Sequence, residues 1–112
     1  MSKSQTTTEL REGDKLRPTH PGEILRTEFL EPLSLSSTKL AIHMGIAASR
    51  VTSIVKGDRS ITADTAFRLA MVFGTSTEFW MNLQSNYDLA MLDFSGEKEK
   101  ISKEVRELVR TS

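Results

Sequence analysis

Residues 36–57, SSTKLAIHMGIAASRVTSIVKG, predict two short helices joined by a very tight turn. Either Ser36 or Ser37 can cap the first helix, and Gly45 supplies the left-handed residue that ends it. Gly57 ends the second helix. Each helix has one apolar face, formed by Leu40, Ala41 and Met44 in the first and by Val51, Ile54 and Val55 in the second. This pattern is typical of a helix-turn-helix motif.

The flanking sequence predicts three more helices and no strand of useful length. The first begins near Pro21 and is stopped by Pro32, because proline suits a first helical turn but not a helix interior. The next is capped by Thr62 and ends at Gly74. The last runs through about residue 93, and its expected N-cap is Thr75, paired with Glu78 in a capping box. We therefore expect an all-α domain with about five helices.

Three segments are expected along the 112 residues. Residues 1–17 have mixed charge and almost no apolar residues, which indicates a flexible arm. Residues 18–94 form the helical domain. Residues 95–112 form a charged tail, in which Ile101, Val105 and Leu108 recur at helical spacing, so that a short helix could form there.

The formal net charge of zero hides a basic segment within the motif. Residues 36–59 carry four cations, Lys39, Arg50, Lys56 and Arg59, against the single acid Asp58, which gives that segment a net charge of +3. Residues 60–94 carry a net charge of −3. Because clustered cations are the electrostatic footprint of nucleic-acid binding, the motif is where we expect DNA to bind.

The outer face of the second motif helix is predicted to consist of small or positive residues: Ala48, Ser49, Thr52, Ser53 and Lys56. Small hydroxyl side chains let a helix approach the floor of a major groove about 12 Å wide, so Ser49, Thr52 and Ser53 are expected at base edges. Arg50 is long enough to reach a guanine or a phosphate. Phosphate contacts are expected from Lys56, from Arg59 and from Ser37 at the start of the first motif helix. The alternative is a helical hairpin with a solvated polar face.

The helix expected over residues 75–93 has more apolar residues than one buried face needs. A dimer contact is one explanation, with Trp80, Leu83, Tyr87, Met91 and Phe94 as the candidate interface residues. The other is a helix enclosed on two sides by its own domain. A base-stacking role for Trp80 is disfavoured, because it lies in the acidic part of the chain.

The composition argues against an enzyme, a metal site and a secreted or membrane protein. Cysteine is absent, which rules out disulfides, thiolate zinc sites and thiol nucleophiles. The two histidines, His20 and His43, have no partner at metal or triad spacing. No signal-peptide core or membrane span is recognisable. We expect a cytoplasmic protein with no catalytic residue, metal or cofactor.

Several motifs resemble one family closely over residues 17–93. They are HPGEIL at 20–25, EFLEPL at 28–33, SIVKGDRSITADTA at 53–66, FGTS at 73–76, FWMNLQ at 79–84 and YDL at 87–89. They resemble the HigA family of addiction-module antitoxins, also called VapI-like, within the Cro/CI-type (XRE) helix-turn-helix superfamily. The resemblance implies a five-helix, lambda-repressor-like domain.

The resemblance also implies a function. Such antitoxins are homodimers that bind a palindromic operator in their own promoter and neutralise a HigB-like, mRNA-cleaving toxin of the RelE type. Matching positions place the recognition helix at Ala47–Lys56. This chain departs from the family pattern there, with Ala47 in place of the usual proline, Ala48 in place of a frequent arginine and Lys56 in place of a common asparagine. An inherited operator sequence is therefore not expected. The alternative is a stand-alone XRE-family regulator without a toxin.

Overall fold

The computed structural model describes residues 16–109, whose regular secondary structure is entirely helical, with no strand among them. In chain order the helices are α2 (Pro21–Ile24), η1 (Leu25–Leu30), α3 (Ser37–Met44), α4 (Ala48–Val55), α5 (Ala63–Phe73), α6 (Thr77–Phe94) and α7 (Glu97–Glu104). The chain divides into two compact units, one of residues 19–89 and one that joins residues 16–18 to residues 90–109. The all-α prediction is confirmed. The predicted arm at residues 1–17 lies almost wholly outside the described residues.

The first helix of the larger unit is a short α-helix that widens into a π-helix, where the sequence predicted a plain helix. His20 caps it, since its Nδ1 accepts a hydrogen bond of 2.8 Å from the Gly22 amide. The wider turn appears in the bond from the Glu31 amide to the Arg26 carbonyl, at 2.9 Å. The helix has ended before Pro32, as predicted.

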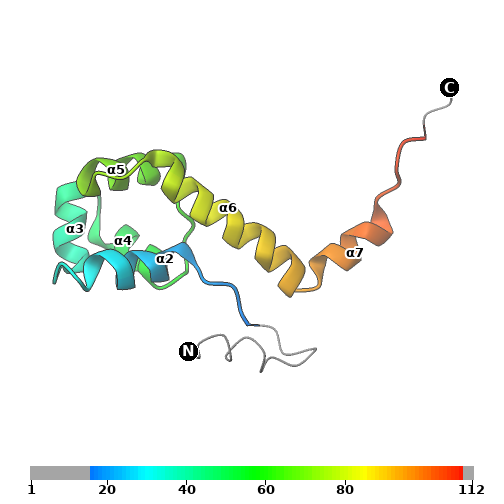
Figure 1. Ribbon diagram of the computed structural model, residues 1–112, viewed down its shortest axis with the longest axis horizontal. Helices are drawn as coiled ribbons and strands as arrows, with labels where there is room; N and C mark the ends of the chain where they lie inside the picture. Colours follow the sequence, from blue (N-terminus) through cyan, green and yellow to red (C-terminus); the bar gives the residue numbers. More distant parts are fainter. Residues whose placement is uncertain (1–15, 110–112) are drawn as a thin grey trace, which may run out of the picture. The chain divides into compact units, whose positions relative to one another are not determined.

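Gly22 is what allows α2 to lie against α4, the two helices seen side by side in Figure 1. A Cβ atom at this position would overlap the Ile54 carbonyl. Only glycine therefore permits this close approach of the two backbones, which packs α2 against the end of α4 at Ile54 and Val55.

The predicted helix-turn-helix motif is present at α3 and α4. The Ser36 hydroxyl caps α3 by accepting the Lys39 amide at 3.0 Å, and Gly45 ends the helix in the left-handed region at φ 72°. The buried faces of both helices join one core with α5 and Trp80, whose apolar members are Leu25, Leu30, Leu40, Ala41, Met44, Val51, Ile54, Ile61, Ala66, Leu69, Ala70 and Trp80.

Two later helix starts were also predicted, one correctly. Thr62 caps α5 and accepts the Thr65 amide at 3.3 Å. The prediction that Thr75 caps α6 is wrong, because Ser76 accepts the Phe79 amide at 3.0 Å. The Thr75 hydroxyl instead accepts the Trp80 indole N–H at 2.7 Å, which satisfies the one polar atom of a ring that is fully buried.

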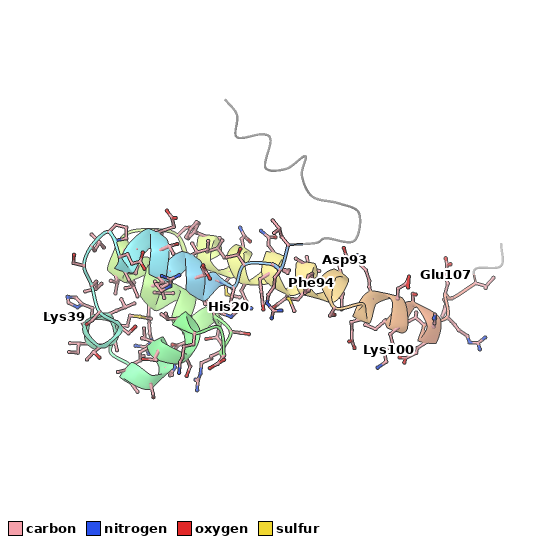
Figure 2. All side chains as sticks on the ribbon, turned by 90° about the horizontal axis from the view of Figure 1, so that it is seen from below. His20, Lys39, Asp93, Phe94, Lys100 and Glu107 are labelled. Carbon is pink, nitrogen blue, oxygen red and sulfur yellow. The ribbon has the colours of Figure 1, made fainter. Side chains whose placement is uncertain are left out.

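The C-terminal segment forms the short helix α7, as its sequence allowed, but the helix ends at Glu104. Of the three apolar residues whose spacing suggested a helix only Ile101 lies in it, because the backbone is extended at Val105 and Leu108 follows in the non-helical end. All residues of α7 are exposed, and labelled charged side chains such as Lys100 project outward from it in Figure 2. Among residues 16–109 no helix is long and apolar enough to cross a membrane.

Candidate nucleic-acid interface

Helix α4 presents a polar edge opposite its buried residues. Val51 and Ile54 are each 1% exposed, whereas Ser49, Thr52 and Lys56 lie on the exposed side, with Ser53 half-buried beside them. These positions recur at three- and four-residue spacing, which keeps them on one side of a helix. The edge is narrow and built of short side chains, as a major groove requires.

The Thr52 hydroxyl has already used its proton. It donates to the Ala48 carbonyl one turn earlier, at 3.0 Å. A base can therefore meet Thr52 only through the oxygen as an acceptor or through the methyl group, which suits a thymine methyl.

The start of α4 differs from the prediction at Ala48. This residue is half-buried and packs against the core instead of standing on the outer face. It precedes Val51 by three residues, so the two share the buried side of the helix. Ala47 is exposed at the N-cap position, where it has extended backbone and makes no side-chain cap.

Arg50 was predicted to reach a base or a phosphate, and the structure gives it other partners. Its Nη2 donates to the Thr65 hydroxyl at 3.2 Å and lies 3.5 Å from a carboxylate oxygen of Asp64, both on α5. Only 33% of the side chain is exposed, and its Nε is buried without a hydrogen-bond partner among the described residues. Arg50 thus joins α4 to α5.

Asp64 is shared with a second arginine. Arg68 Nε donates to the same Asp64 oxygen at 2.7 Å, and Arg68 Nη1 donates to the Met44 carbonyl at 2.8 Å. The hydrogen bond from Arg68, followed by the charges of both arginines, lowers the pKa of the Asp64 carboxyl. The same pair raises the pKa of Arg68. The Met44 carbonyl belongs to the last turn of α3, where helix carbonyls lack intrahelical partners.

The remaining predicted cations lie at the C-terminal end of α4. Lys56 caps the end of α4 and Arg59 follows in the loop to α5, and both are exposed. Within residues 16–109 neither takes part in an ion pair. Ser37 is half-buried at the first position of α3, and Lys39, exposed on the same helix, is labelled in Figure 2.

The loop that carries Arg59 is fixed by a buried amide that the sequence did not reveal. Gln84, 5% exposed on α6, accepts the Ile61 amide proton through Oε1 at 2.8 Å. Its Nε2 donates to Asp88 at 2.9 Å. A glutamine on a mostly apolar helix was the available signal, because such a residue is buried only when it is hydrogen-bonded.

The end of α4 is packed against His20. A Cβ at Gly57 would lie 3.6 Å from the His20 ring, and the rings of His20 and Tyr87 pack in a T-shaped arrangement with centroids 4.9 Å apart. Burial lowers the pKa of His20, although Asp88 and Asp58 attract its proton. A lowered pKa favours the neutral ring, in agreement with the hydrogen bond that Nδ1 accepts from the Gly22 amide.

Comparison with known proteins identifies the family. Residues 28–80 match the model of a helix-turn-helix family. The chain is 49% identical over 74 residues to Virulence-associated protein I of Dichelobacter nodosus, which covers 66% of this chain and 68% of that protein. It is 41% identical over 75 residues to Antitoxin HigA-1 of Vibrio cholerae, covering 67% and 70% respectively. The chain belongs to the HigA family of helix-turn-helix antitoxins.

A solved HigA-family structure shows the same fold. The structure titled Pseudomonas aeruginosa antitoxin HigA with higBA promoter is 46% identical, with a TM-score of 0.75, and the match covers 83% of this chain and 100% of that one. The lambda-repressor-like architecture inferred from the sequence motifs is confirmed by this likeness.

The candidate dimer residues of this HigA-family chain fall into two groups. Trp80 is fully buried, Leu83 packs against the core and Tyr87 lies against His20, so their apolar surface is largely used within the chain. Met91 and Phe94 are half-buried near the end of α6, where the Arg17 guanidinium lies over the Phe94 ring at 5.9 Å from its centroid.

A second apolar surface escaped the sequence analysis. Phe67 and Met71 on α5 are 57% and 71% exposed and line a groove of about 620 Å³. Ile42 on α3 is also exposed, at 70%. Phe67 and Met71 stand one turn apart on the side of α5 that faces away from its buried residues. The signal was a second apolar stripe on one helix.

Proposed function

We propose that this protein is the antitoxin of a type II toxin–antitoxin pair. As a homodimer it binds a palindromic operator in its own promoter and represses transcription, and it neutralises a HigB-like, mRNA-cleaving toxin. It acts in the cytoplasm and needs no catalytic residue, metal or cofactor. The observation that carries the DNA-binding half is the exposed polar edge of α4, followed at the C-terminal end of the helix by Lys56 and Arg59, which make no ion pair within residues 16–109, in a family with a member solved on promoter DNA.

The proposed contacts divide by chemistry. Ser49, Thr52 and Ser53 read base edges, with Ala47 and the exposed part of Ala48 at the groove floor. Lys56, Arg59 and the start of α3 at Ser37 hold phosphates and set the register without reading sequence. A dimer then places two α4 helices about 34 Å apart, in successive major grooves.

Fluorescence anisotropy on a promoter fragment, titrated at several salt concentrations, tests this assignment. Lys56→Ala removes two phosphate contacts per dimer, so the slope of log K against log salt should become shallower by about 2, for operator and unrelated DNA alike. Lys100→Ala on α7 also removes an exposed charge and should leave the slope unchanged. Equal slopes for wild type and Lys56→Ala would exclude this edge as the DNA face.

Dimerisation is tested separately, by light scattering coupled to gel filtration. Met91→Glu and Phe94→Glu should shift the dimer to monomer if the end of α6 forms the contact. Met71→Glu is the matched variant on the second apolar surface and should leave the dimer intact. A monomer in Met71→Glu, with an intact dimer in Met91→Glu and Phe94→Glu, would instead place the dimer contact on α3 and α5.

The toxin-binding half is tested by co-expression with the reading frame beside the gene. Capture of a basic protein of about 90 residues on the tagged antitoxin, with relief of its growth inhibition, is the expected result. A chain that represses its promoter but captures no such protein is instead a stand-alone XRE-family regulator.

A further inference from the structure

Arg50 is the only cation within α4, and its placement decides how that helix can read DNA. An arginine in this part of a recognition helix has the length to reach a guanine or a phosphate. In the structure its guanidinium turns toward α5 instead, donating to Thr65 and lying 3.5 Å from Asp64. The edge of α4 that remains exposed carries hydroxyl side chains.

We infer that Asp64 is a specificity-determining residue, because together with Thr65 it holds Arg50 against α5 and keeps off the groove-facing edge of α4 a cation that could otherwise bind phosphates of any sequence. The inference rests on the proposed DNA-binding function. Arg50 is then a positioning residue, and sequence is read by the short side chains of Ser49, Thr52 and Ser53.

Asp64 can do this because its carboxylate connects three helices. One oxygen lies between the two arginines, 2.7 Å from Arg68 Nε and 3.5 Å from Arg50 Nη2. Arg68 reaches in turn to the Met44 carbonyl at the end of α3. The chain of contacts therefore runs from the end of α3, through the start of α5, to the start of α4.

Charge explains why this arrangement favours selectivity. Phosphate contacts strengthen binding to every sequence alike, whereas base-edge contacts distinguish sequences. A released Arg50 would add one cation per subunit to the DNA face, and loss of the Asp64 charge would remove a repulsion nearby. For a released Arg50 the gain is unequal. On operator DNA the base contacts of Ser49, Thr52 and Ser53 fix where α4 lies, whereas on unrelated DNA the helix is free to shift until Arg50 meets a phosphate. Release should therefore raise non-specific affinity more than specific affinity.

A double-mutant cycle measures the effect. Wild type, Asp64→Asn, Arg50→Ala and the double variant are titrated against an operator fragment and a scrambled fragment over a range of salt. Asp64→Asn should steepen the salt slope by about 2 per dimer, since two arginines gain phosphates. It should also lower the operator-to-scrambled affinity ratio about tenfold. The double variant should return to the wild-type slope, and Arg50→Ala alone should keep it.

Three further variants separate positioning from structure and from bulk charge. Asp64→Glu retains the carboxylate and should restore the wild-type ratio. Glu78→Gln removes an exposed acid at the start of α6 and should change neither slope nor ratio. Arg68→Gln leaves the pair between Asp64 and Arg50 in place and should also keep the wild-type slope, even where it lowers the melting temperature.

Two results would overturn the inference. One is an Arg50→Ala protein that loses operator affinity tenfold or more but keeps its affinity for scrambled DNA, since Arg50 would then read a base. The other is an Asp64→Asn protein that is indistinguishable from Glu78→Gln. Wild-type protein that binds neither fragment refutes the proposed function itself, and that measurement is made first in the same series.

Discussion

Replacing Gln84 by leucine should destabilise the domain through one backbone group. Leucine keeps most of the volume but removes the Oε1 that accepts the Ile61 amide at 2.8 Å, so a buried N–H in the loop after α4 loses its partner. An orphaned buried donor costs about 1 to 3 kcal/mol. Loss of the bond to Asp88 adds little, because Asp88 is exposed.

The expected loss is therefore about 2 kcal/mol in the free energy of unfolding, or about 8 to 16 °C in melting temperature for a domain of this size. Urea denaturation followed by circular dichroism measures it. Hydrogen exchange locates it, since the Ile61 amide should exchange faster in Gln84→Leu while amides of α3 change little.

Asn82→Leu is the matched control on the same helix. Its side chain is exposed, so the same kind of substitution should shift stability by no more than about 0.5 kcal/mol. Asp88→Asn keeps an acceptor for Gln84 Nε2 and should also be mild. The reasoning fails if Gln84→Leu is as stable as Asn82→Leu, or if it is less stable while Ile61 remains protected.

Three further substitutions test local features of the fold. Ser76→Ala should lower the free energy of unfolding by about 1 kcal/mol, because α6 loses its N-cap. Thr75→Val should instead change the fluorescence of Trp80, whose indole N–H loses its acceptor. A larger loss of stability in Thr75→Val than in Ser76→Ala would favour Thr75 as the cap of α6, as the sequence predicted. Gly22→Ala should lower the free energy of unfolding by about 3 kcal/mol, because the added methyl group overlaps the Ile54 carbonyl and pushes α2 away from α4. A variant as stable as the wild type would show that the two helices are not so close. Burial lowers the pKa of His20 from its ordinary 6.5, so the unfolded chain takes up a proton first as the pH falls, and stability should decrease below about pH 6.5. His20→Asn keeps a capping side chain that does not titrate. The urea midpoint of the wild type should therefore fall relative to that of His20→Asn between pH 7.5 and pH 5, whereas the difference would stay constant if folding did not change the pKa of His20.

Local signals in the sequence were sufficient for most of the backbone. The glycines at 45 and 74 end helices in the left-handed region, and Ser36 and Thr62 provide caps, because each of these effects depends on a few neighbouring residues. The error at Thr75 arose where two adjacent hydroxyl residues offered the same cap. Only the position of the Trp80 indole, set by the tertiary fold, decided between them.

The candidate site was harder to predict, because a sequence pattern shows which side chains are exposed more readily than which side chains contact each other. Helical spacing correctly placed Ser49, Thr52 and Lys56 on the exposed edge of α4. It could not show that Arg50 lies beside Asp64, since the two are fourteen positions apart and meet only when α5 packs across the motif. Contacts of this kind depend on how helices pack, and no local pattern records them.

The contact between Arg50 and Asp64 changes how many cations of the motif are available to DNA. Counted along the sequence, residues 36–59 offer four cations, yet Arg50 is bound to an acid from the next segment. Lys39, Lys56 and Arg59 then remain without an ion pair in the described structure. Lys39 lies on α3, so Lys56 and Arg59 are the two at the end of α4, which makes four per dimer. Four phosphate contacts correspond to a salt slope of about −3.6, so binding to unrelated DNA should be weak at physiological salt. An operator must therefore be held mainly by contacts to bases and by the fit of two α4 helices to their half-sites, and changes that loosen either should weaken operator binding much more than binding to unrelated DNA.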